Sequence, residues 1–174
     1  GLTLLPADVR AQVGYDVVVA DTVNHALRGV RLRDGRVRTL AGTGQQWRQG
    51  DAFPDHAFSD TPLTSPWDVA WHPQWRQVAI AMAGNHQIWA FDPLSARVSL
   101  RAGTTREGLV DGDLGSAWFA QPSGLAMSAD GETLWLVDAE TSSLRRIRNG
   151  VVHTEVGAGL FEFGLVDGPA STAL

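Results

Sequence analysis

The chain has 174 residues, of which 44% are hydrophobic and 19% charged, the composition of a folded domain rather than of a disordered segment. Its 14 basic and 19 acidic residues give a net charge of −5 without a visible basic stripe, which argues against a nucleic-acid partner. The sequence contains no cysteine, which excludes disulfides and thiolate metal sites, and no apolar run long enough to cross a membrane.

The predicted elements are almost all strands, in three groups of four. The groups begin with inner strands near residues 1–5, 67–71 and 123–127. Each inner strand is followed by a short apolar run (17–20 in the first group), a polar turn, an alternating strand, a hairpin turn and an outer strand. No segment has a sustained period of 3.6 residues, so we expect helices of a single turn at most.

Three markers recur in the same order and phase along the chain. They are a glycine turn that closes a strand, an Asp-Gly or Gly-Asp pair in the connection that follows, and a polar turn before an alternating strand. The markers fall at Gly42, Gly103 and Gly157; at Gly50-Asp51, Asp111-Gly112 and Asp167-Gly168; and at Asn24-His25, Asn85-His86 and Thr141-Ser142. Their common phase defines repeat units of about 1–66, 67–122 and 123–174.

Four antiparallel strands per repeat form the blade of a β-propeller. The expected fold class is therefore all-β, a propeller fragment of three four-stranded antiparallel blades that is half of a six-bladed ring. Because propellers usually close with about 4–8 blades, three blades leave two apolar faces bare, and such faces favour association. We expect the remaining blades or a second copy of the chain to cover them, and the isolated chain not to be a stable monomer.

The polar turns resemble the Asn-His-Leu signature of NHL repeats at residues 24–27 and 85–88, and the Ala-Gly-Thr-Gly turn at 41–44 fits the same pattern. The third repeat departs from the signature, with Thr141-Ser142-Ser143-Leu144. More narrowly, three segments are similar to the propeller portion of proteins that couple a thioredoxin-like domain to NHL repeats. These segments are 65–70, 85–89 and 138–145. The resemblance implies a six-bladed propeller that follows a thioredoxin-like domain absent from these residues.

The histidines are interpreted as structural. His25 and His86 occupy the same slot in consecutive repeats, which favours contacts with a neighbouring strand or loop, and Ser142 breaks the series. A catalytic zinc needs about three protein ligands that converge, whereas His56, His72 and His153 fall at unrelated places. No metal ligand and no cofactor is therefore predicted.

Two other motifs are interpreted as turns. The segment Asp111-Gly112-Asp113 lacks the continuation of a calcium-binding loop, and aspartate beside glycine is favoured in turns. The glycine-rich residues 41–44 follow a strand, but no helix follows them, so the phosphate-binding helix N-terminus is missing.

The connections at 43–65 and 104–121 are expected on one face, around the channel, together with the polar turns. Candidates for ligand or partner binding there are Trp47, Arg48, Trp67, Asp68, His86, Arg106 and Glu107. The two tryptophans are exposed aromatics in this interpretation, and a role in closing the loop is equally consistent with their positions. Asp68, in the slot of Gly124 and with Arg106 and His86 expected nearby, either orients a ligand or accepts hydrogen bonds from loop N–H groups.

Two function classes remain open. The favoured one is a non-catalytic interaction platform that binds a protein or peptide on the loop-rich face, as an accessory to the implied thioredoxin-like domain. The alternative is a metal-dependent lyase or lactonase-type propeller enzyme with its site in the central channel, because propellers host both classes. The sequence opens at Gly1 without an initiator Met or a visible signal peptide, so we expect an excerpt of a longer protein. The sequence does not identify the compartment of that protein, and the cytoplasm is favoured.

Overall fold

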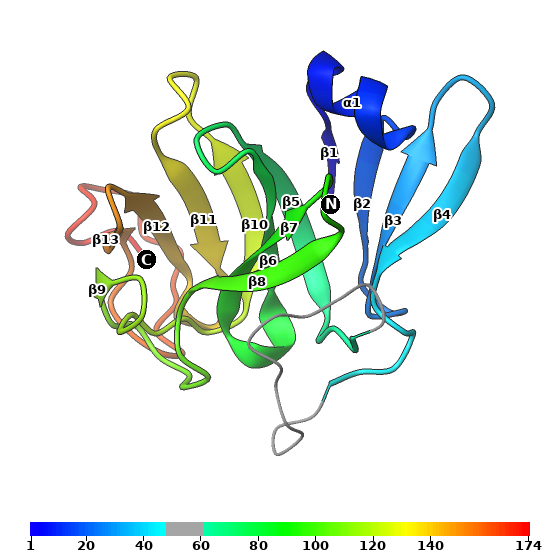
Figure 1. Ribbon diagram of the computed structural model, residues 1–174. Coiled ribbons are helices and arrows are strands. Elements are labelled where there is room, and N and C mark those ends of the chain that lie inside the picture. Colours follow the sequence, from blue (N-terminus) through cyan, green and yellow to red (C-terminus); the bar gives the residue numbers. More distant parts are fainter. Residues whose placement is uncertain (48–60) are drawn as a thin grey trace.

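Three antiparallel sheets stand side by side in the computed structural model, which describes residues 1–47 and 61–174 (Figure 1). Blade 1 has the strand order β1 (Leu2–Leu4), β2 (Val17–Asp21), β3 (Ala26–Arg31) and β4 (Arg36–Ala41). Blade 2 has the order β5 (Pro66–His72), β6 (Gln77–Met82), β7 (Gln87–Asp92) and β8 (Arg97–Ala102). Blade 3 has the order β10 (Pro122–Met127), β11 (Leu134–Asp138), β12 (Ser143–Arg148), β13 (Val151–Val156) and β9 (Gly112–Asp113).

The inner strands β1, β5 and β10 lie where the sequence predicts them, and the three-blade, all-β architecture is confirmed. The second and third strands of each blade are joined at the polar turns, of which those in blades 2 and 3 form the short 3₁₀ helices η1 (Ala83–Asn85) and η2 (Ala139–Thr141). None of the described helices is long and apolar enough to cross a membrane.

The helix α1 (Ala7–Val13) corrects the expectation of single turns at most. It lies between β1 and β2, at the upper edge of Figure 1, and ends at Gly14, whose left-handed backbone (φ 76°) lets its N–H bond the carbonyl of Arg10. Val9 is the buried residue of this helix. Val9 and the partly buried Val13 pack against the blade, and two apolar positions are too few to give the sequence a sustained helical period.

Strand β9 corrects two expectations, the count of twelve strands and the interpretation of Asp111-Gly112-Asp113 as a turn. The described residues form thirteen strands, because Gly112 and Asp113 pair with Val152 and Val151 at the outer edge of blade 3. The partner strand lies about 40 residues further along the chain, so no local pattern around Asp111 signals the pairing.

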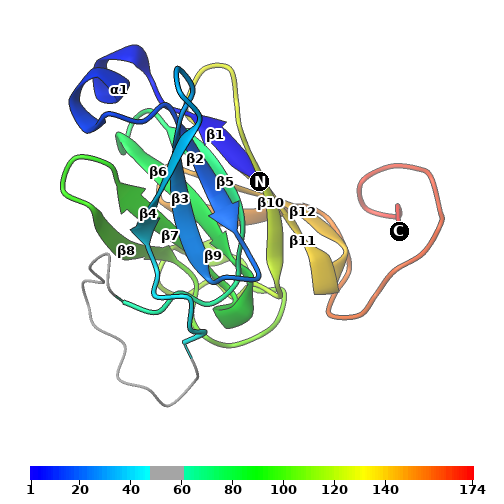
Figure 2. The same cartoon turned by 90° about the vertical axis from the view of Figure 1, so that its right-hand side faces the viewer.

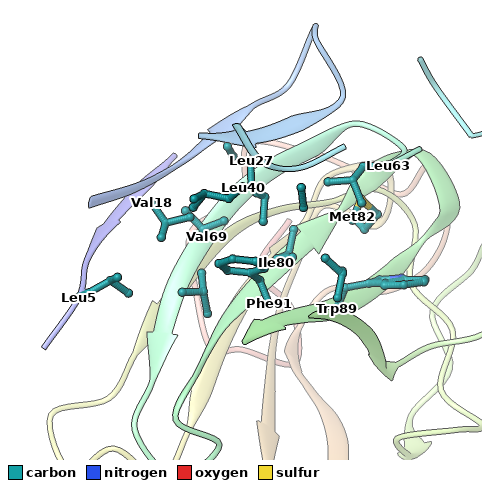
Figure 3. Packing of buried hydrophobic residues seen from close by; sticks show 14 of the residues in the cluster. Leu5, Val18, Leu27, Leu40, Leu63, Val69, Ile80, Met82, Trp89 and Phe91 are labelled. Carbon is teal, nitrogen blue, oxygen red and sulfur yellow. The ribbon is translucent and has the colours of Figure 1, made fainter. Parts of the chain in front are cut away.

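Blades 1 and 3 each bury one face against blade 2, which is buried on both of its faces. A first cluster of buried side chains joins blades 1 and 2, and Figure 3 shows Val18, Leu27 and Leu40 of blade 1 facing Val69 and Ile80 of blade 2. A second cluster joins blades 2 and 3 through residues that include Ile88, Phe119, Leu134, Leu136 and Ile147. Close packing of alternate strand residues therefore forms two separate interfaces rather than one central core.

The outer faces of blades 1 and 3 remain open, as the repeat count predicts. On blade 1, Leu2 is 67% and Val37 61% exposed, and on blade 3, Val137 is 46% exposed. Along β11, the exposed Val137 alternates with the buried Leu136 and Asp138, as in a sheet made to be covered on both faces. The instability of the isolated monomer stays a prediction.

A buried ion network fixes the connection between blades 2 and 3. The Arg145 side chain is fully buried and donates hydrogen bonds to the carbonyls of Trp118 (2.6 Å) and Val110 (2.9 Å). It also contacts the carboxylates of Asp111 at 3.0 Å and Asp138 at 3.5 Å. Burial raises the pKa of Asp138 to about 6, against the opposing effects of the Ala120 N–H and Arg145.

Replacing Arg145 tests how much this network stabilises the fold. We expect Arg145→Ala to lower the free energy of unfolding by about 3–5 kcal/mol, because Asp138 would be left buried without its counter-charge. The neighbouring Arg146→Ala is the matched control, since its ion pair with Glu155 is partly exposed and should contribute about 1 kcal/mol or less. Urea unfolding followed by circular dichroism measures both. Equal losses for the two variants would contradict a buried network.

Candidate functional site

The loop-rich face carries the polar turns and the blade-to-blade connections, and lies at the lower edge of Figure 1. On this face His25 accepts a hydrogen bond at Nδ1 from the Ser65 N–H (3.1 Å), and His86 accepts one at Nδ1 from the Gln121 N–H (3.2 Å). Ser65 and Gln121 immediately precede the inner strands of blades 2 and 3. The expected loop contacts of both histidines are therefore confirmed.

The backbone at the turn holds each imidazole in place. His25 and His86 both have positive φ angles, 46° and 58°, and Ser142 keeps the same conformation with φ 47°. A left-handed residue at this position reverses the chain after the turn. Burial lowers the pKa of His86, against the effect of the Glu107 charge, so its imidazole is neutral at physiological pH and can accept the Gln121 hydrogen bond.

A hollow of about 260 Å³ opens on this face beside η1. Its lining residues are Ser65, Trp67, Ala83, Gly84, His86 and Gln121. Trp67 lies at a β-bulge, where the register between β5 and β6 shifts between Pro66 and Asp68, and its side chain is half-buried. Gly84 is required for the close approach of the connection, because a Cβ there would lie 2.3 Å from Thr64 Oγ1.

A pair of carboxyl groups lies next to the hollow. A hydrogen bond with Glu107, burial and the Glu107 charge together raise the pKa of Glu140 to about 7. Gln121, which lines the hollow, donates to Glu140 Oε1 through its side-chain amide. Glu140 therefore loses its proton only near neutral pH, and a cation could replace that proton.

Asp68 is held by backbone groups. Its Oδ2 accepts a hydrogen bond from the Leu125 N–H at 2.7 Å, and its Oδ1 accepts one from the Val69 N–H at 2.8 Å. The amino group of Gly1 lies 3.9 Å from Oδ1. The geometry favours the second interpretation of Asp68, as an acceptor of backbone N–H groups. Its hydrogen bond with Leu125 links the inner strands of blades 2 and 3.

The other predicted residues fall into different surroundings. The exposure expected for Trp47 is wrong, because the residue is 9% exposed and its backbone N–H donates a hydrogen bond to the Leu63 carbonyl at 3.0 Å. Arg106, expected beside Asp68, is exposed and stacks its guanidinium over Trp118 at 5.1 Å. Arg48 lies outside the described residues.

The remaining histidines do not converge. His72 is buried and stacks on Trp75, with ring centroids 3.8 Å apart, and His153 lies 3.2 Å from the carboxylate of Asp111. His56 lies outside the described residues. Across residues 1–47 and 61–174, no three His, Cys, Asp or Glu side chains are grouped so that they could hold a metal ion.

The sequence prediction missed Ser65, Gln121 and Glu140. Glu140 had a usable signal, because it occupies in η2 the middle position that Gly84 occupies in η1. In both cases a carboxylate occupies a position that is glycine in another repeat: Glu140 corresponds to Gly84, and Asp68 corresponds to Gly124. Ser65 and Gln121 had no such signal, since they act through backbone N–H groups that any residue supplies.

Comparisons with known proteins support the repeat assignment. The chain is 36% identical over 165 residues to the protein SUPPRESSOR OF QUENCHING 1, chloroplastic, of Arabidopsis thaliana, covering 90% of this chain and 16% of that one. It is 35% identical over 181 residues to NHL repeat-containing protein 2 of Bos taurus, covering 87% of this chain and 24% of that one. The chain thus spans a quarter or less of the length of these relatives. No family model matches it.

Solved structures share the fold at low sequence identity. A protein of unknown function from Bacteroides thetaiotaomicron aligns with a TM-score of 0.69 and 19% identity, over 90% of this chain and 36% of that one. A gluconolactonase from Xanthomonas campestris aligns with a TM-score of 0.56 and 16% identity, over 90% of this chain and 56% of that one. At these identities the likeness concerns the fold alone.

Substitution of His86 tests its structural role. We expect His86→Leu to lower the free energy of unfolding by about 1–3 kcal/mol, because the Gln121 N–H loses its acceptor. His86→Asn should recover much of this loss, since asparagine tolerates the left-handed backbone and offers a side-chain oxygen. Urea unfolding ranks the variants. A leucine variant as stable as the asparagine variant would contradict the role of the hydrogen bond.

Proposed function

Because the chain consists of three blades of an NHL-repeat β-propeller, we propose that it is a non-catalytic interaction platform that binds a protein or peptide on its loop-rich face. The hollow beside η1 supports this proposal most directly. It offers a half-buried aromatic side chain, Trp67, and hydrogen-bonding groups of His86 and Gln121 at its wall. Aromatic residues in partly desolvated pockets contribute strongly to protein binding.

The charge next to the hollow suggests the chemistry of the partner. Glu140, beside the Glu107 carboxyl, keeps its proton up to near neutral pH, and a guanidinium or ammonium group would replace that proton with a fixed positive charge. A peptide that places an arginine or lysine at this pair and an apolar side chain against Trp67 fits both features. We propose such a basic, partly apolar segment as the partner.

The larger context of the platform is also a proposal. The resemblance to thioredoxin-like/NHL-repeat proteins supports a role as an accessory to a thioredoxin-like domain outside these residues. The cytoplasmic location favoured from the sequence belongs to the same proposal, although one relative carries the word chloroplastic in its name.

The alternative, a metal-dependent lyase or lactonase-type enzyme with a site in the central channel, draws support from the fold shared with a gluconolactonase. A catalytic metal needs about three converging protein ligands, and the described residues hold no group of three candidate ligands. Stoichiometric metal in the purified protein, together with chelator-sensitive hydrolysis of simple lactones, would favour this alternative over the platform.

Selection of peptides from a random displayed library tests the platform. We expect the selected peptides to bind the wild-type chain, and Trp67→Ala to weaken their binding by about tenfold or more, because the aromatic anchor is lost. Trp75→Ala is the matched control, since Trp75 is also partly exposed but stacks on His72 away from the hollow. Fluorescence anisotropy gives the Kd values. Equal effects of both variants would contradict binding at the hollow.

The pH dependence of binding tests the basic partner. The pKa of Glu140 is raised to about 7, so the carboxyl pair gains its second negative charge as the pH rises through that value. We therefore expect a selected basic peptide to bind more tightly at pH 8 than at pH 6. Glu140→Gln should remove most of this dependence while leaving binding at pH 6 nearly unchanged. Binding that weakens from pH 6 to pH 8 would contradict the assignment.

A further inference from the structure

The outer end of blade 1 concentrates positive charge, although the net charge of the chain is −5. Five of the 14 basic residues lie on α1 and on the hairpin between β3 and β4. They are Arg10, Arg31, Arg33, Arg36 and Arg38. Among them, Arg10 and Arg31 form ion pairs with Asp16 and Asp34. In Figure 1 and Figure 2, α1 and the tip of this hairpin both lie at the upper edge of the molecule.

Like charges oppose each other in this hairpin. Arg31 is paired with Arg36 at the end of the ladder between β3 and β4. Arg38 is paired with Gly29, two positions along, so all three arginines lie on one face of the blade. Gly29 is paired in turn with Val18 of the cluster between blades 1 and 2, so this face is the one turned to blade 2. Directly opposed like charges destabilise a ladder unless an opposite charge neutralises them.

The other two blades carry no such pair at the same ladder position. In blade 2 the last pair of the ladder is Asp92 and Arg97, which have opposite charges. In blade 3 it is Arg148 and Val151. Arg148 also forms an ion pair with Glu132. Of the three blades, only blade 1 opposes two arginines, and an anion bound between them would neutralise both.

Tyr15 takes the place of a neutralising carboxylate in blade 1. It lies two residues before the first paired residue of β2, as Glu132 does before β11. Burial raises the pKa of Tyr15 to about 12, so the hydroxyl keeps its proton and adds no negative charge. Arg38 stacks over the ring at 4.6 Å and donates a hydrogen bond to the Val13 carbonyl at 3.0 Å. Gly29 leaves room for the ring, because a Cβ there would lie 3.0 Å from Tyr15 Cγ.

A hollow of about 180 Å³ lies among these side chains, and its lining includes Tyr15, Arg31, Arg36 and Arg38. We call it the arginine hollow. A second hollow of about 210 Å³ shares Tyr15 and Arg38 with it. The wall of this second hollow is apolar on the side of blade 2, where it is formed by Phe91, Pro93 and Ala96. The two hollows together offer a charged end and an apolar end to one ligand.

The arginines keep donors for such a ligand. Asp34 accepts hydrogen bonds from the Arg31 side chain at both carboxylate oxygens and from the backbone N–H of Arg36. Within residues 1–47 and 61–174, the guanidinium of Arg36 itself has no hydrogen-bond or ion-pair partner. Because each guanidinium has five N–H donors, those of Arg31 and Arg38 also keep donors beyond the bonds described.

We propose that the arginine hollow binds the phosphate group of a small phosphomonoester whose alcohol part is apolar. Arg36 and Arg38 donate to the phosphate oxygens, since the guanidinium fork matches them in pairs. The alcohol part packs along Tyr15 toward Phe91 and Pro93. Three guanidiniums around so small a space favour a phosphate, with almost two negative charges at neutral pH, over a single carboxylate.

This site is separate from the hollow beside η1. The arginine hollow adjoins α1 at the upper edge of Figure 1, whereas the loop-rich face lies at the lower edge. It also lies on the side of blade 1 that is turned to blade 2, within the junction of two described blades. The proposal therefore stands independently of peptide binding.

Titration calorimetry of the full-length protein with phenyl phosphate tests the site. We expect a Kd of about 1 mM or lower, and we expect Arg36→Gln to raise it by about tenfold or more. Arg36→Lys should recover part of the affinity, because an ammonium group keeps the charge without the fork. Arg146→Gln is the matched control, since it removes the same charge from blade 3 and should leave the Kd nearly unchanged. Circular dichroism verifies the fold of each variant.

The choice of ligand tests the two ends of the site. Inorganic phosphate should bind more weakly than phenyl phosphate, because it lacks the apolar part. Phenol, which lacks the anion, should show no heat of binding. Inorganic phosphate that binds as tightly as phenyl phosphate would overturn the assignment of an apolar alcohol part.

Hydrogen exchange gives a second readout that needs no variant. Phenyl phosphate should slow amide exchange in residues 29–38 and leave residues 143–156 of blade 3 unchanged. Protection confined to other segments would overturn the proposal, as would equal effects of Arg36→Gln and Arg146→Gln on the Kd. So would a single-stranded oligonucleotide whose binding depends on Arg36 and which phenyl phosphate does not displace.

Discussion

The structure depends on the burial of flat sheet faces against one another. A four-stranded antiparallel sheet with apolar residues on both faces cannot be stable alone, because each face exposes rows of valine, leucine and isoleucine. Each blade therefore depends on its neighbours, and the loops, histidines and ion pairs act on a stack that this burial has already arranged. Polar contacts then fix how each blade is rotated against the next.

These polar contacts differ between the two interfaces, although the strands repeat. The junction of blades 1 and 2 uses Trp89 where the junction of blades 2 and 3 uses Arg145. A large apolar ring fills space in any arrangement, whereas a buried guanidinium requires carbonyls and carboxylates at defined distances. The second junction is thus more specific for its partner, and the histidine contacts to Ser65 and Gln121 are common to both.

The sequence predicted the blades well, because strand alternation and the repeated turns are local signals that the tertiary structure reinforces. It missed α1, whose apolar contact with the blade is made by Val9 and Val13, and β9, whose pairing with β13 is set by residues far along the chain. The site was predicted in part. Trp67 and His86 line the hollow, while Glu140 and Gln121 were missed because their importance arises from a neighbour, Glu107, and from the fold of the connection.

Strand β9 also affects how the outer rim of the molecule meets other chains. The outermost strand of a sheet presents unpaired N–H and C=O groups on which a foreign strand can add. In blade 3 the connection itself occupies this place along Val151 and Val152. In blades 1 and 2 the rim strands β4 and β8 instead carry arginines, at Arg36 and Arg38 and at Arg97 and Arg101, whose charges disfavour strand addition. The same chain thus protects its edges from aggregation in two ways, by covering one and charging the others.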